Sequence, residues 1–312
     1  MSRQKIVGIL GGGKWGSSLG GKLSQSCRVK LYCRDLNADY QKQGELEYFS
    51  NIEELKGSDL LMMAVPSFAV KEVAQRFQPF YSGQPIVGIS KGLEQGTGLL
   101  SSQIIQEVWG ETKYAHLSGP SFAEEVSRGF PAIFSLALAD LNLQRYFQNI
   151  IDLEGLKIQL TEDLVGVQLG GALKNIIAIA AGISEALGYG ENFRAMLILQ
   201  GLQEMVSLGK KLGAQEKTFF GPSGLGDLIL TATSRQSRNY RLGIQLVENS
   251  QNKTGAIIEK DTFEGVSTAA GAYFLTRKFN LRLPIIEGVY RVIYENKNPK
   301  EFLKEIQESD IC

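Results

Sequence analysis

Short apolar runs alternate with helical segments through the first half of the chain. Runs rich in Val, Ile and Leu predict strands buried on both faces, and they lie at residues 5–10, 28–33, 59–65, 85–90, 114–119 and 132–138. Helical patterns fall between them, at residues 14–26, 68–78, 99–108 and 121–128. Strands that alternate with helices are typical of a parallel sheet. We therefore expect an α/β domain over residues 1–162.

The pattern changes at about Asp163. Beyond it, apolar positions recur with helical spacing and predict long helices at residues 163–187 and 192–212, followed by shorter helices interrupted by Gly and Pro. Strand patterns are not evident in this part of the sequence. We expect an all-α second domain over residues 163–312.

Lys174 is the only charged residue between Asp163 and Glu185, in the apolar run LVGVQLGGALKNIIAIAAGIS. A lysine removed from water has a lowered pKa, which suits proton transfer near neutral pH. Lys174 is therefore a candidate proton donor, unless its flexible stem carries the ammonium to the surface. The run is long enough to cross a bilayer, but its polar residues Gln168 and Asn175 and its four glycines favour a buried core helix.

A glycine-rich segment, GGGKWG, follows the first predicted strand and opens a predicted helix. In that context Gly11, Gly13 and Gly16 match a dinucleotide-binding fingerprint, in which glycines allow a tight turn and a close approach of the pyrophosphate. A glycine-rich turn without a ligand is the alternative. A P-loop is disfavoured because Trp15 follows Lys14 where Ser or Thr should coordinate magnesium.

The second predicted strand ends beside a possible cofactor-selecting residue. Arg34 stands where an NAD-selective protein commonly has an acid, and a cation there favours the 2′-phosphate of NADP. Asp35 follows and could instead bind the ribose, or Arg34 could be a solvated turn residue. His116, the single histidine, lies inside a predicted strand and is more typical of a structural role than of catalysis.

Charge and cysteine content narrow the classes of partner. Lys plus Arg and Asp plus Glu each total 33, so the net charge is zero and neither nucleic acid nor a membrane surface is favoured. Cys27, Cys33 and Cys312 suggest neither a disulfide framework nor a metal site. The N-terminus lacks the apolar region of a signal peptide. We expect a cytoplasmic protein with a small-molecule partner and no metal.

Six sequence blocks occur in the order found in a known family. They are GGGKWGSSL, SKGLE, SGPSFAEE, GGALKN, GPSGLGDL and SRNYRLG. The chain resembles the bacterial-type NAD(P)-dependent glycerol-3-phosphate dehydrogenases over almost its whole length. The resemblance implies a Rossmann-type domain followed by an all-α domain. It also implies reversible reduction of dihydroxyacetone phosphate to sn-glycerol 3-phosphate, a glycerophospholipid precursor, with NAD(P)H. Arg34 favours NADP over NAD as that cofactor.

The same resemblance implies roles for particular residues. Lys174 would be the proton donor, with Lys91 and Asp227 beside it in catalysis. The substrate contacts would come from Lys91, Gly119, Ser121, Lys174, Asn175, Asp227, Thr231, Ser237, Arg238 and Asn239. The cofactor contacts would come from Gly11, Gly13, Lys14, Trp15, Gly16, Arg34, Lys91, Ala123, Arg238 and Glu264. A homodimer is one possible assembly.

Arg238 suits a phosphate because a guanidinium can donate two parallel hydrogen bonds to it. With Arg235 and Arg241 it could also belong to a solvated face or a nucleic-acid strip, although zero net charge favours a single phosphate pocket.

The chain also departs from the family pattern. Gln168 stands in place of a common Glu, and Leu199 and Gln200 stand in place of a usual Thr and Arg. Two other functions remain as alternatives. One is a dehydrogenase of another small β-hydroxy or keto acid, although there the helix lysine has its asparagine four residues later, where this chain has Ala178. The other is a non-catalytic NADP sensor.

Overall fold

The computed structural model describes residues 4–36, 45–138, 143, 146–147, 155–248 and 263–309. The chain divides into two compact units. The first comprises Met1–Ser90 and Ser101–Leu164, and the second comprises Lys91–Leu100 and Val165–Cys312. The short segment Lys91–Leu100 thus leaves the first unit and packs with the second. Cys312 lies outside the described residues.

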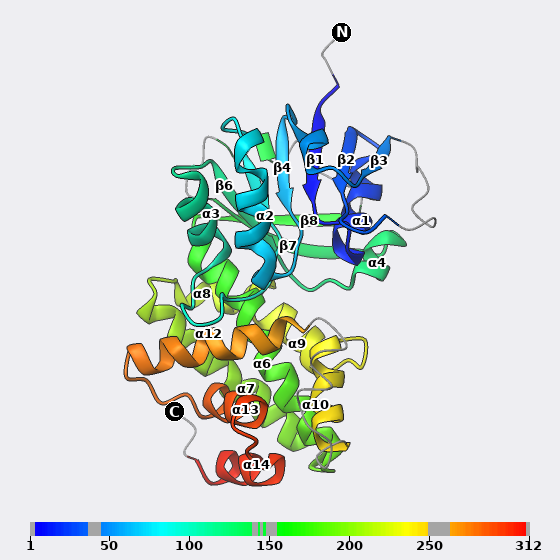
Figure 1. Ribbon diagram of the computed structural model, residues 1–312. Helices are drawn as coiled ribbons and strands as arrows, with labels where there is room; N and C mark the ends of the chain where they lie inside the picture. The colour runs from blue at the N-terminus through cyan, green and yellow to red at the C-terminus, as the bar shows by residue number, and fades with distance from the viewer. Residues whose placement is uncertain are drawn as a thin grey trace. The chain divides into compact units, whose positions relative to one another are not determined.

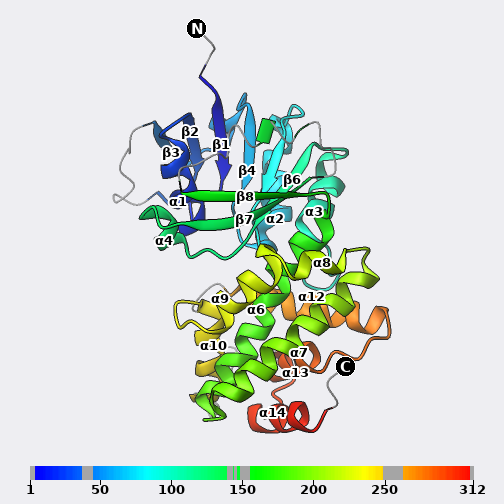
Figure 2. The same cartoon turned by 180° about the vertical axis from the view of Figure 1, so that it is seen from behind.

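Within the described residues, the first unit is built on one sheet with the strand order β3-β2-β1-β4-β5-β6-β7-β8 (Figures 1 and 2). The strands are β1 (Ile6–Leu10), β2 (Arg28–Tyr32), β3 (Leu46–Phe49), β4 (Leu60–Met63), β5 (Ile86–Gly88), β6 (Tyr114–Ser118), β7 (Ala132–Leu138) and β8 (Leu156–Thr161). The helices are α1 (Lys14–Leu23), α2 (Val70–Phe77), α3 (Ser101–Trp109) and α4 (Ala123–Ser127), with the 3-10 turns η1 (Ile52–Leu55), η2 (Ser67–Ala69) and η3 (Gln78–Phe80).

The strand order explains how this sheet can hold a nucleotide. β1 pairs in parallel with β2 on one side and with β4 on the other. The chain order therefore reverses between β1 and β4, and ligands of such sheets bind beyond the carboxyl ends of the strands at this reversal. β1 and β4 are almost entirely buried, as their apolar runs predict. The expected α/β fold with a Rossmann-type sheet is confirmed.

The sheet extends beyond the strands that the apolar pattern predicts. β3 and β8 were not expected, and each is an edge strand with a single partner, β2 and β7 respectively. Their side chains are mostly half-exposed, so the continuous apolar signal of a central strand is missing. β7 runs antiparallel to β6. In Figure 2, β7 and β8 run horizontally whereas β1 and β4 run vertically. This difference in strand direction shows how strongly the sheet twists.

From Val165 onward, the described part of the second unit is helical (Figure 1). Its elements are α6 (Leu164–Ala186), α7 (Gly190–Lys211), α8 (Glu216–Phe219), the π-helical turn η5 (Pro222–Gly226), α9 (Asp227–Ala232), α10 (Arg238–Glu248), α12 (Glu264–Lys278), α13 (Pro284–Tyr294) and α14 (Pro299–Glu308). The all-α character expected from the sequence is confirmed.

Helix α6 is the centre of the second unit. It is the one helix of the described residues long and apolar enough to cross a membrane, and 89% of its most apolar window is buried inside the protein. Its apolar residues belong to a core cluster shared with α7, α9, α10, α12 and α13. An apolar helix surrounded in this way is a core helix, and burial all round also explains its weak amphipathic pattern.

Candidate active site

The glycine-rich turn of the first unit has the local geometry that a dinucleotide requires. Gly11 has a φ of 124°, and a Cβ there would lie 2.8 Å from the backbone of Ala64. A Cβ on Gly16 would lie 2.0 Å from the carbonyl oxygen of Gly11, so α1 packs directly on the turn. Gly13 faces open space, and as the N-cap of α1 it offers no side chain to the first-turn amides. This helix N-terminus can therefore accept a phosphate.

The remaining predicted cofactor residues of this unit lie close to that turn or follow the next strand. Trp15 packs against the ring of Phe134, with the ring centroids 6.0 Å apart, whereas Lys14 is exposed. Ser18 on α1 donates a hydrogen bond to the carbonyl of Ala123, at 2.8 Å, and so joins α1 to α4. The pattern of contacts brings the start of α4 to the glycine-rich helix.

Arg34 and Asp35 occupy the turn after β2 and interact with each other. Their side chains form an ion pair at 3.4 Å and are about three-quarters exposed. Because both groups are accessible, the turn can present a cation or an acid to a ribose. Close by, a Cβ on Gly12 would meet the side chain of Cys33 at 2.6 Å, which places this turn against the glycine loop.

The GPS segment follows β6. A Cβ on Gly119 would lie 2.4 Å from the carbonyl of Ile133, and the hydroxyl of Ser121 donates to the carbonyl of Gly119 at 2.9 Å. His116 is fully buried in β6, with its Nδ1 3.1 Å from the Tyr114 hydroxyl. This pairing fits the structural role expected for the single histidine.

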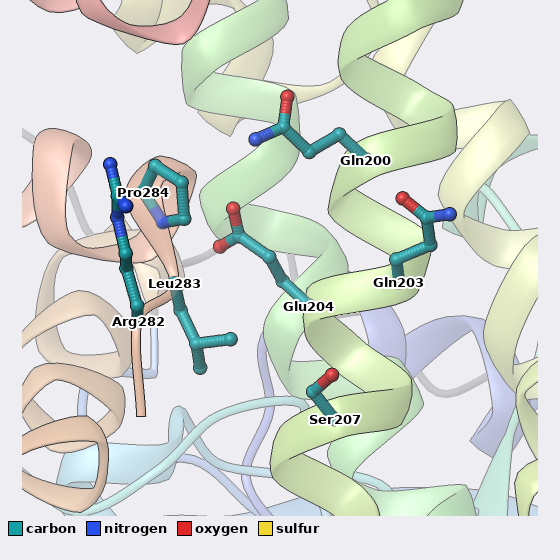
Figure 3. A pocket seen from close by; sticks show the side chains of 7 residues that line it. All are labelled: Gln200, Gln203, Glu204, Ser207, Arg282, Leu283 and Pro284. Carbon is teal, nitrogen blue, oxygen red and sulfur yellow. The ribbon is translucent and has the colours of Figure 1, made fainter. Parts of the chain in front are cut away.

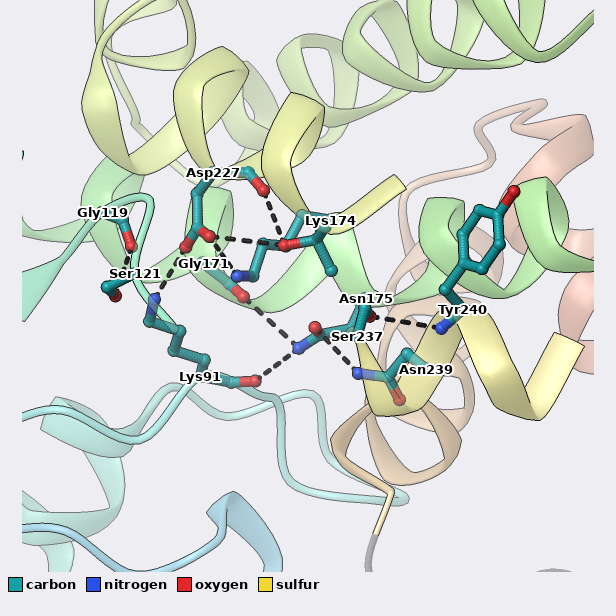
Figure 4. Close-up of polar contacts among 11 residues, drawn as sticks. Lys91, Gly119, Ser121, Gly171, Lys174, Asn175, Asp227, Ser237, Asn239 and Tyr240 are labelled. Atoms are coloured by element: carbon teal, nitrogen blue, oxygen red, sulfur yellow. Dashed lines mark hydrogen bonds and ion pairs between the residues drawn. The ribbon is translucent and has the colours of Figure 1, made fainter. Parts of the chain in front are cut away.

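Two lysines and one carboxylate form the centre of the candidate site in the second unit (Figure 4). Lys174 of α6 donates a hydrogen bond to Oδ1 of Asp227, and Lys91 donates to Oδ2 at 2.8 Å. The side chains are 7%, 11% and 0% exposed for Lys174, Lys91 and Asp227. Lys174 therefore does not snorkel to solvent, and the sequence prediction of a buried ammonium is correct.

The backbone around Asp227 explains why the carboxylate meets Lys174. Asp227 begins α9 directly after the π-helical turn η5, whose PSGLG sequence carries two glycines. A Cβ on Gly170, one turn before Lys174, would lie 2.4 Å from the carbonyl of Ser223. α6 and η5 thus contact each other through backbone, which brings the first residue of α9 against the lysine.

Burial sets the electrostatics of this cluster. Desolvation lowers the pKa of Lys174 to about 7, the charge of Asp227 opposes the change, and the ammonium of Lys91 adds to it. With both amines protonated, two positive charges face one negative charge. The cluster can therefore stabilise negative charge on a bound oxygen and exchange a proton near neutral pH.

An amide bridge connects this cluster to two other elements. Asn175 donates to the carbonyl of Lys91 at 2.9 Å and accepts from the Nδ2 of Asn239, also at 2.9 Å. Asn239 in turn accepts from the backbone N–H of Gly265 at 3.0 Å. Sequence reasoning placed Asn175 and Asn239 at the substrate, but it missed their mutual contact and the part played by Gly265. A pair 64 residues apart leaves no periodic signal.

The arginines just before α10 and in its first turns bind different partners. Arg235 forms hydrogen bonds with Glu185, and Arg241 donates to the carbonyls of Arg235 and Gln236 at 2.8 and 3.2 Å. Ser237 accepts from the N–H of Tyr240 at 3.2 Å and so caps α10. Two of the three arginines therefore bind within the protein, which does not support a continuous nucleic-acid strip.

Two weaker predictions fall near the same elements. Thr231 donates to the backbone carbonyl of Asp227 at 2.6 Å, and its Oγ1 lies 3.4 Å from Oδ1 of that residue. The threonine thus lies on the same face of α9 as the carboxylate. Glu264 begins α12 next to Gly265, and its carbonyl accepts from Thr268 at 2.6 Å.

Family models match both parts of the chain. Residues 6–144 match the NAD-dependent glycerol-3-phosphate dehydrogenase N-terminus, and residues 163–304 match the C-terminus of the same family. The glycerol-3-phosphate dehydrogenase [NAD(P)+] of Syntrophotalea carbinolica is 35% identical, over 98% of each chain. That of Carboxydothermus hydrogenoformans is 37% identical, over 95% of this chain and 94% of the relative.

Solved structures agree with the sequence comparison. The crystal structure of glycerol-3-phosphate dehydrogenase from Coxiella burnetii superposes with a TM-score of 0.91 at 30% identity, covering 98% of this chain and 99% of that one. A ketopantoate reductase from Ralstonia eutropha shares the fold alone, with a TM-score of 0.60 at 12% identity over 97% and 99% of the two chains. The chain belongs to the NAD-dependent glycerol-3-phosphate dehydrogenase family.

Proposed function

We propose that this protein is a glycerol-3-phosphate dehydrogenase [NAD(P)+] that reversibly reduces dihydroxyacetone phosphate to sn-glycerol 3-phosphate. The observation that carries the proposal is the buried Lys174–Asp227–Lys91 cluster in a chain that matches both family models. The product is the head-group precursor of glycerophospholipids. The enzyme is therefore assigned to lipid synthesis.

We assign cofactor binding and substrate binding to different parts of the chain. Residues 1–162 hold the dinucleotide through Gly11, Gly13 and Gly16, with Lys14, Trp15, Ala123 and Arg34 around it. The open face of Gly13 and the uncapped start of α1 fit a pyrophosphate. The bound nicotinamide supplies or accepts the hydride. Residues 163–312, with Lys91, Gly119 and Ser121, hold the substrate.

Lys174 is the proton donor of the reduction in this proposal. Hydride addition to the ketone carbon builds negative charge on its oxygen, which the ammonium stabilises before it gives up a proton. In the reverse direction the neutral amine accepts that proton. Asp227 stabilises the protonated form of Lys174 through one carboxylate oxygen. Lys91 places a second positive charge beside the other oxygen.

The phosphate of the substrate is assigned to the start of α10. Arg238 offers a guanidinium with bidentate geometry, and Ser237 and Asn239 flank it. Thr231 contributes beside Asp227. Glu264 and Arg238, which begin α12 and α10, are assigned to the cofactor as well because the family resemblance implies it.

An assay with purified protein tests the proposal. Reduced nicotinamide should be consumed rapidly with dihydroxyacetone phosphate and slowly with unphosphorylated dihydroxyacetone. Lys174→Ala should abolish turnover while the fold, followed by circular dichroism, is kept. Turnover of small keto acids alone would overturn the substrate assignment, and cofactor binding without any turnover would favour a sensor.

Cofactor preference has a separate test. We expect NADPH to be preferred because Arg34 follows β2, where a dinucleotide-binding sheet holds the ribose, and only NADPH carries a 2′-phosphate. Arg34→Ala should then raise the KM for NADPH and leave that for NADH nearly unchanged. An equal rise for both cofactors would remove Arg34 from this role.

The same proposal includes a cytoplasmic location and a homodimeric assembly. The burial of α6, the one described helix that could cross a membrane by length and composition, supports a protein that does not span a membrane. Sedimentation equilibrium of the purified protein measures the assembly. A mass of one chain at all concentrations would exclude the dimer.

A further inference from the structure

Glu185, near the C-terminal end of α6, gathers three side chains from other parts of the second unit. Arg235 donates to its carboxylate through Nε at 2.8 Å and also through Nη2. Tyr240 donates its hydroxyl proton to the other oxygen, and Arg194 of α7 lies 3.6 Å from that oxygen. The Glu185 carboxylate thus connects α6 to α7 and to both ends of the segment from Arg235 to Tyr240, which includes the start of α10.

The tyrosine is the buried member of this network. Tyr240 is 1% exposed, and its hydroxyl also accepts a hydrogen bond from Arg194 at 3.0 Å. The hydrogen bond from the Tyr240 hydroxyl is the main reason why the pKa of the Glu185 carboxyl is lowered, and Arg235 lowers it further. The carboxylate therefore stays ionised through the neutral range and keeps its charge-assisted bonds.

Close backbone packing makes this connection rigid. A Cβ on Gly182 would lie 2.0 Å from the carbonyl of Tyr240, and a Cβ on Gly243 would lie 2.1 Å from the carbonyl of Ile179. α6 and α10 therefore meet at backbone distance. Glu185 holds the start of α10 at this crossing, whereas Lys174 lies eleven residues earlier on α6, about 16 Å along the helix.

Arg238 and Asn239 stand between the two anchored residues. Arg235 precedes Arg238 by three residues, and Tyr240 directly follows Asn239, so one carboxylate holds the segment on both sides. Asn239 is further fixed by Asn175, next to Lys174 on α6. The same helix thus sets the place of the proton donor and the place of the phosphate-binding turn.

We propose that Glu185 is a positioning residue that acts through Arg235 and Tyr240 to fix the phosphate-binding turn at Ser237–Asn239 relative to Lys174. The inference rests on the proposed function, since it assumes that Arg238 receives the substrate phosphate. Glu185 itself touches neither substrate nor cofactor. Its loss should change recognition of the phosphate more than the chemical step.

Glu185→Gln and Tyr240→Phe test the inference because each removes part of the network with little change of volume. We expect the KM for dihydroxyacetone phosphate to rise about tenfold while kcat falls much less, since the turn is displaced but Lys174 is kept. Turnover of unphosphorylated dihydroxyacetone should not change. The matched control is Glu191→Gln, because Glu191 binds Arg194 only on its exposed side and leaves the Glu185–Tyr240 bond intact.

Calorimetric titration with inorganic phosphate separates this inference from the proposed function. Weaker phosphate binding by both variants, with the control unchanged, supports the positioning role even if no substrate is turned over. Equal losses with the phosphorylated and unphosphorylated ketone, or unchanged phosphate affinity in both variants, would show that Glu185 only stabilises the fold. Failure of the wild-type protein to turn over dihydroxyacetone phosphate would instead overturn the proposed function.

Discussion

Asp227 and Glu204 are both buried carboxylates of the helical unit, but their surroundings satisfy them in different ways. Asp227 is fully buried and faces two ammonium groups, from Lys91 and Lys174. Glu204 of α7 is 4% exposed and accepts the backbone N–H groups of Ile285 and Ile286, at 2.8 and 3.0 Å. The burial of the Asp227 carboxylate is compensated by charged side chains, and that of Glu204 by backbone N–H dipoles.

The surroundings of Glu204 explain its role. Its two partners lie in the first turn of α13, where unpaired N–H groups need an acceptor. A cavity of about 20 Å³ beside it is lined by Gln200, Gln203, Ser207 and Arg282 (Figure 3). The Oε1 atoms of both glutamines are buried without a hydrogen-bond partner. Both oxygens of Glu204 are used by the helix terminus. The group therefore anchors α13 to α7.

The two arrangements lead to different chemistry. Burial raises the pKa of Glu204 to about 8, although its two backbone donors act in the opposite direction and Glu287 adds to the rise. At the other site, burial lowers the pKa of Lys174 to about 7. Only the Asp227 cluster has charge and protons that a ligand can use. The comparison shows that burial of a carboxylate alone does not identify a catalytic site.

The largest expected effect is on catalysis by Asp227→Asn. Without the carboxylate, the pKa of Lys174 falls further because only desolvation and Lys91 act on it. The amine is then mostly neutral at pH 7, and kcat/KM for ketone reduction should fall roughly 10²-fold, within the range of general acid catalysis. Steady-state kinetics measures it. Glu204→Gln is the control and should keep most of the activity; an equal loss there would abolish the distinction between the two carboxylates.

The second effect concerns stability at Glu204. Glu204→Ala leaves two buried N–H groups without an acceptor and enlarges the cavity, which should cost about 2–4 kcal/mol of unfolding free energy. Glu204→Gln keeps an acceptor oxygen and should cost about 1 kcal/mol or less at pH 7. Urea denaturation measures both variants. Equal losses for Ala and Gln would mean that one amide oxygen cannot replace the two carboxyl oxygens that hold α13.

The apolar pattern was sufficient for the central strands and for α6 but not for the edges of the sheet. β1 and β4 are buried on both faces and read as continuous apolar runs. β8 carries Lys157 and Gln159 among its apolar residues and pairs with β7 alone, so it lacks that signal. The direction of β7 also depends on its partner and not on its own composition.

The site could be predicted where a residue is unusual for its local context. Lys174 is a charge in an apolar helix, and its burial confirms the reason for choosing it. Glu204 gave no such signal, because it lies in a helix with other polar residues and its partners are 81 and 82 residues away. Contacts between distant segments follow from packing, which a single sequence does not display.

The third effect is a pH dependence of opposite sign at the two sites. Glu204 has a pKa of about 8 in the folded protein against an ordinary 4.5, so the folded state holds its proton longer and stability falls as pH rises through that interval. Lys174 has a pKa of about 7 against 10.5, so the unfolded state binds more protons and stability rises between those values.

Urea denaturation from pH 6 to pH 7.5 isolates the Glu204 effect as the difference between the wild-type protein and Glu204→Gln, because Lys174 titrates in both proteins. The wild-type protein should lose about 1–2 kcal/mol from this group over the interval, and Glu204→Gln should remove that loss. Lys174→Met is the matched variant for the other sign and should flatten the rise above pH 7. A stability profile that Glu204→Gln leaves unchanged would show that the carboxyl is already ionised at pH 6.

The smallest effect is expected from Gln200→Arg, which introduces the residue that the family resemblance predicts at this position. Gln200 lies four residues before Glu204 on α7 and borders the same cavity, so an arginine there could pair with the carboxylate. A guanidinium favours the ionised carboxylate and lowers its pKa. Unfolding free energy should therefore increase by about 1 kcal/mol at pH 8 and less at pH 6.

Leu199→Arg is the matched control for this substitution, because Leu199 is 52% exposed and its charge would lie in solvent. It should leave stability unchanged at both pH values. A gain from Gln200→Arg that is the same at pH 6 and pH 8 would show that the arginine fills the cavity without pairing with Glu204. A gain confined to pH 8 would show that Gln200→Arg has given Glu204 an ion pair of the kind seen at Asp227. Activity should stay the same because no ligand reaches Glu204.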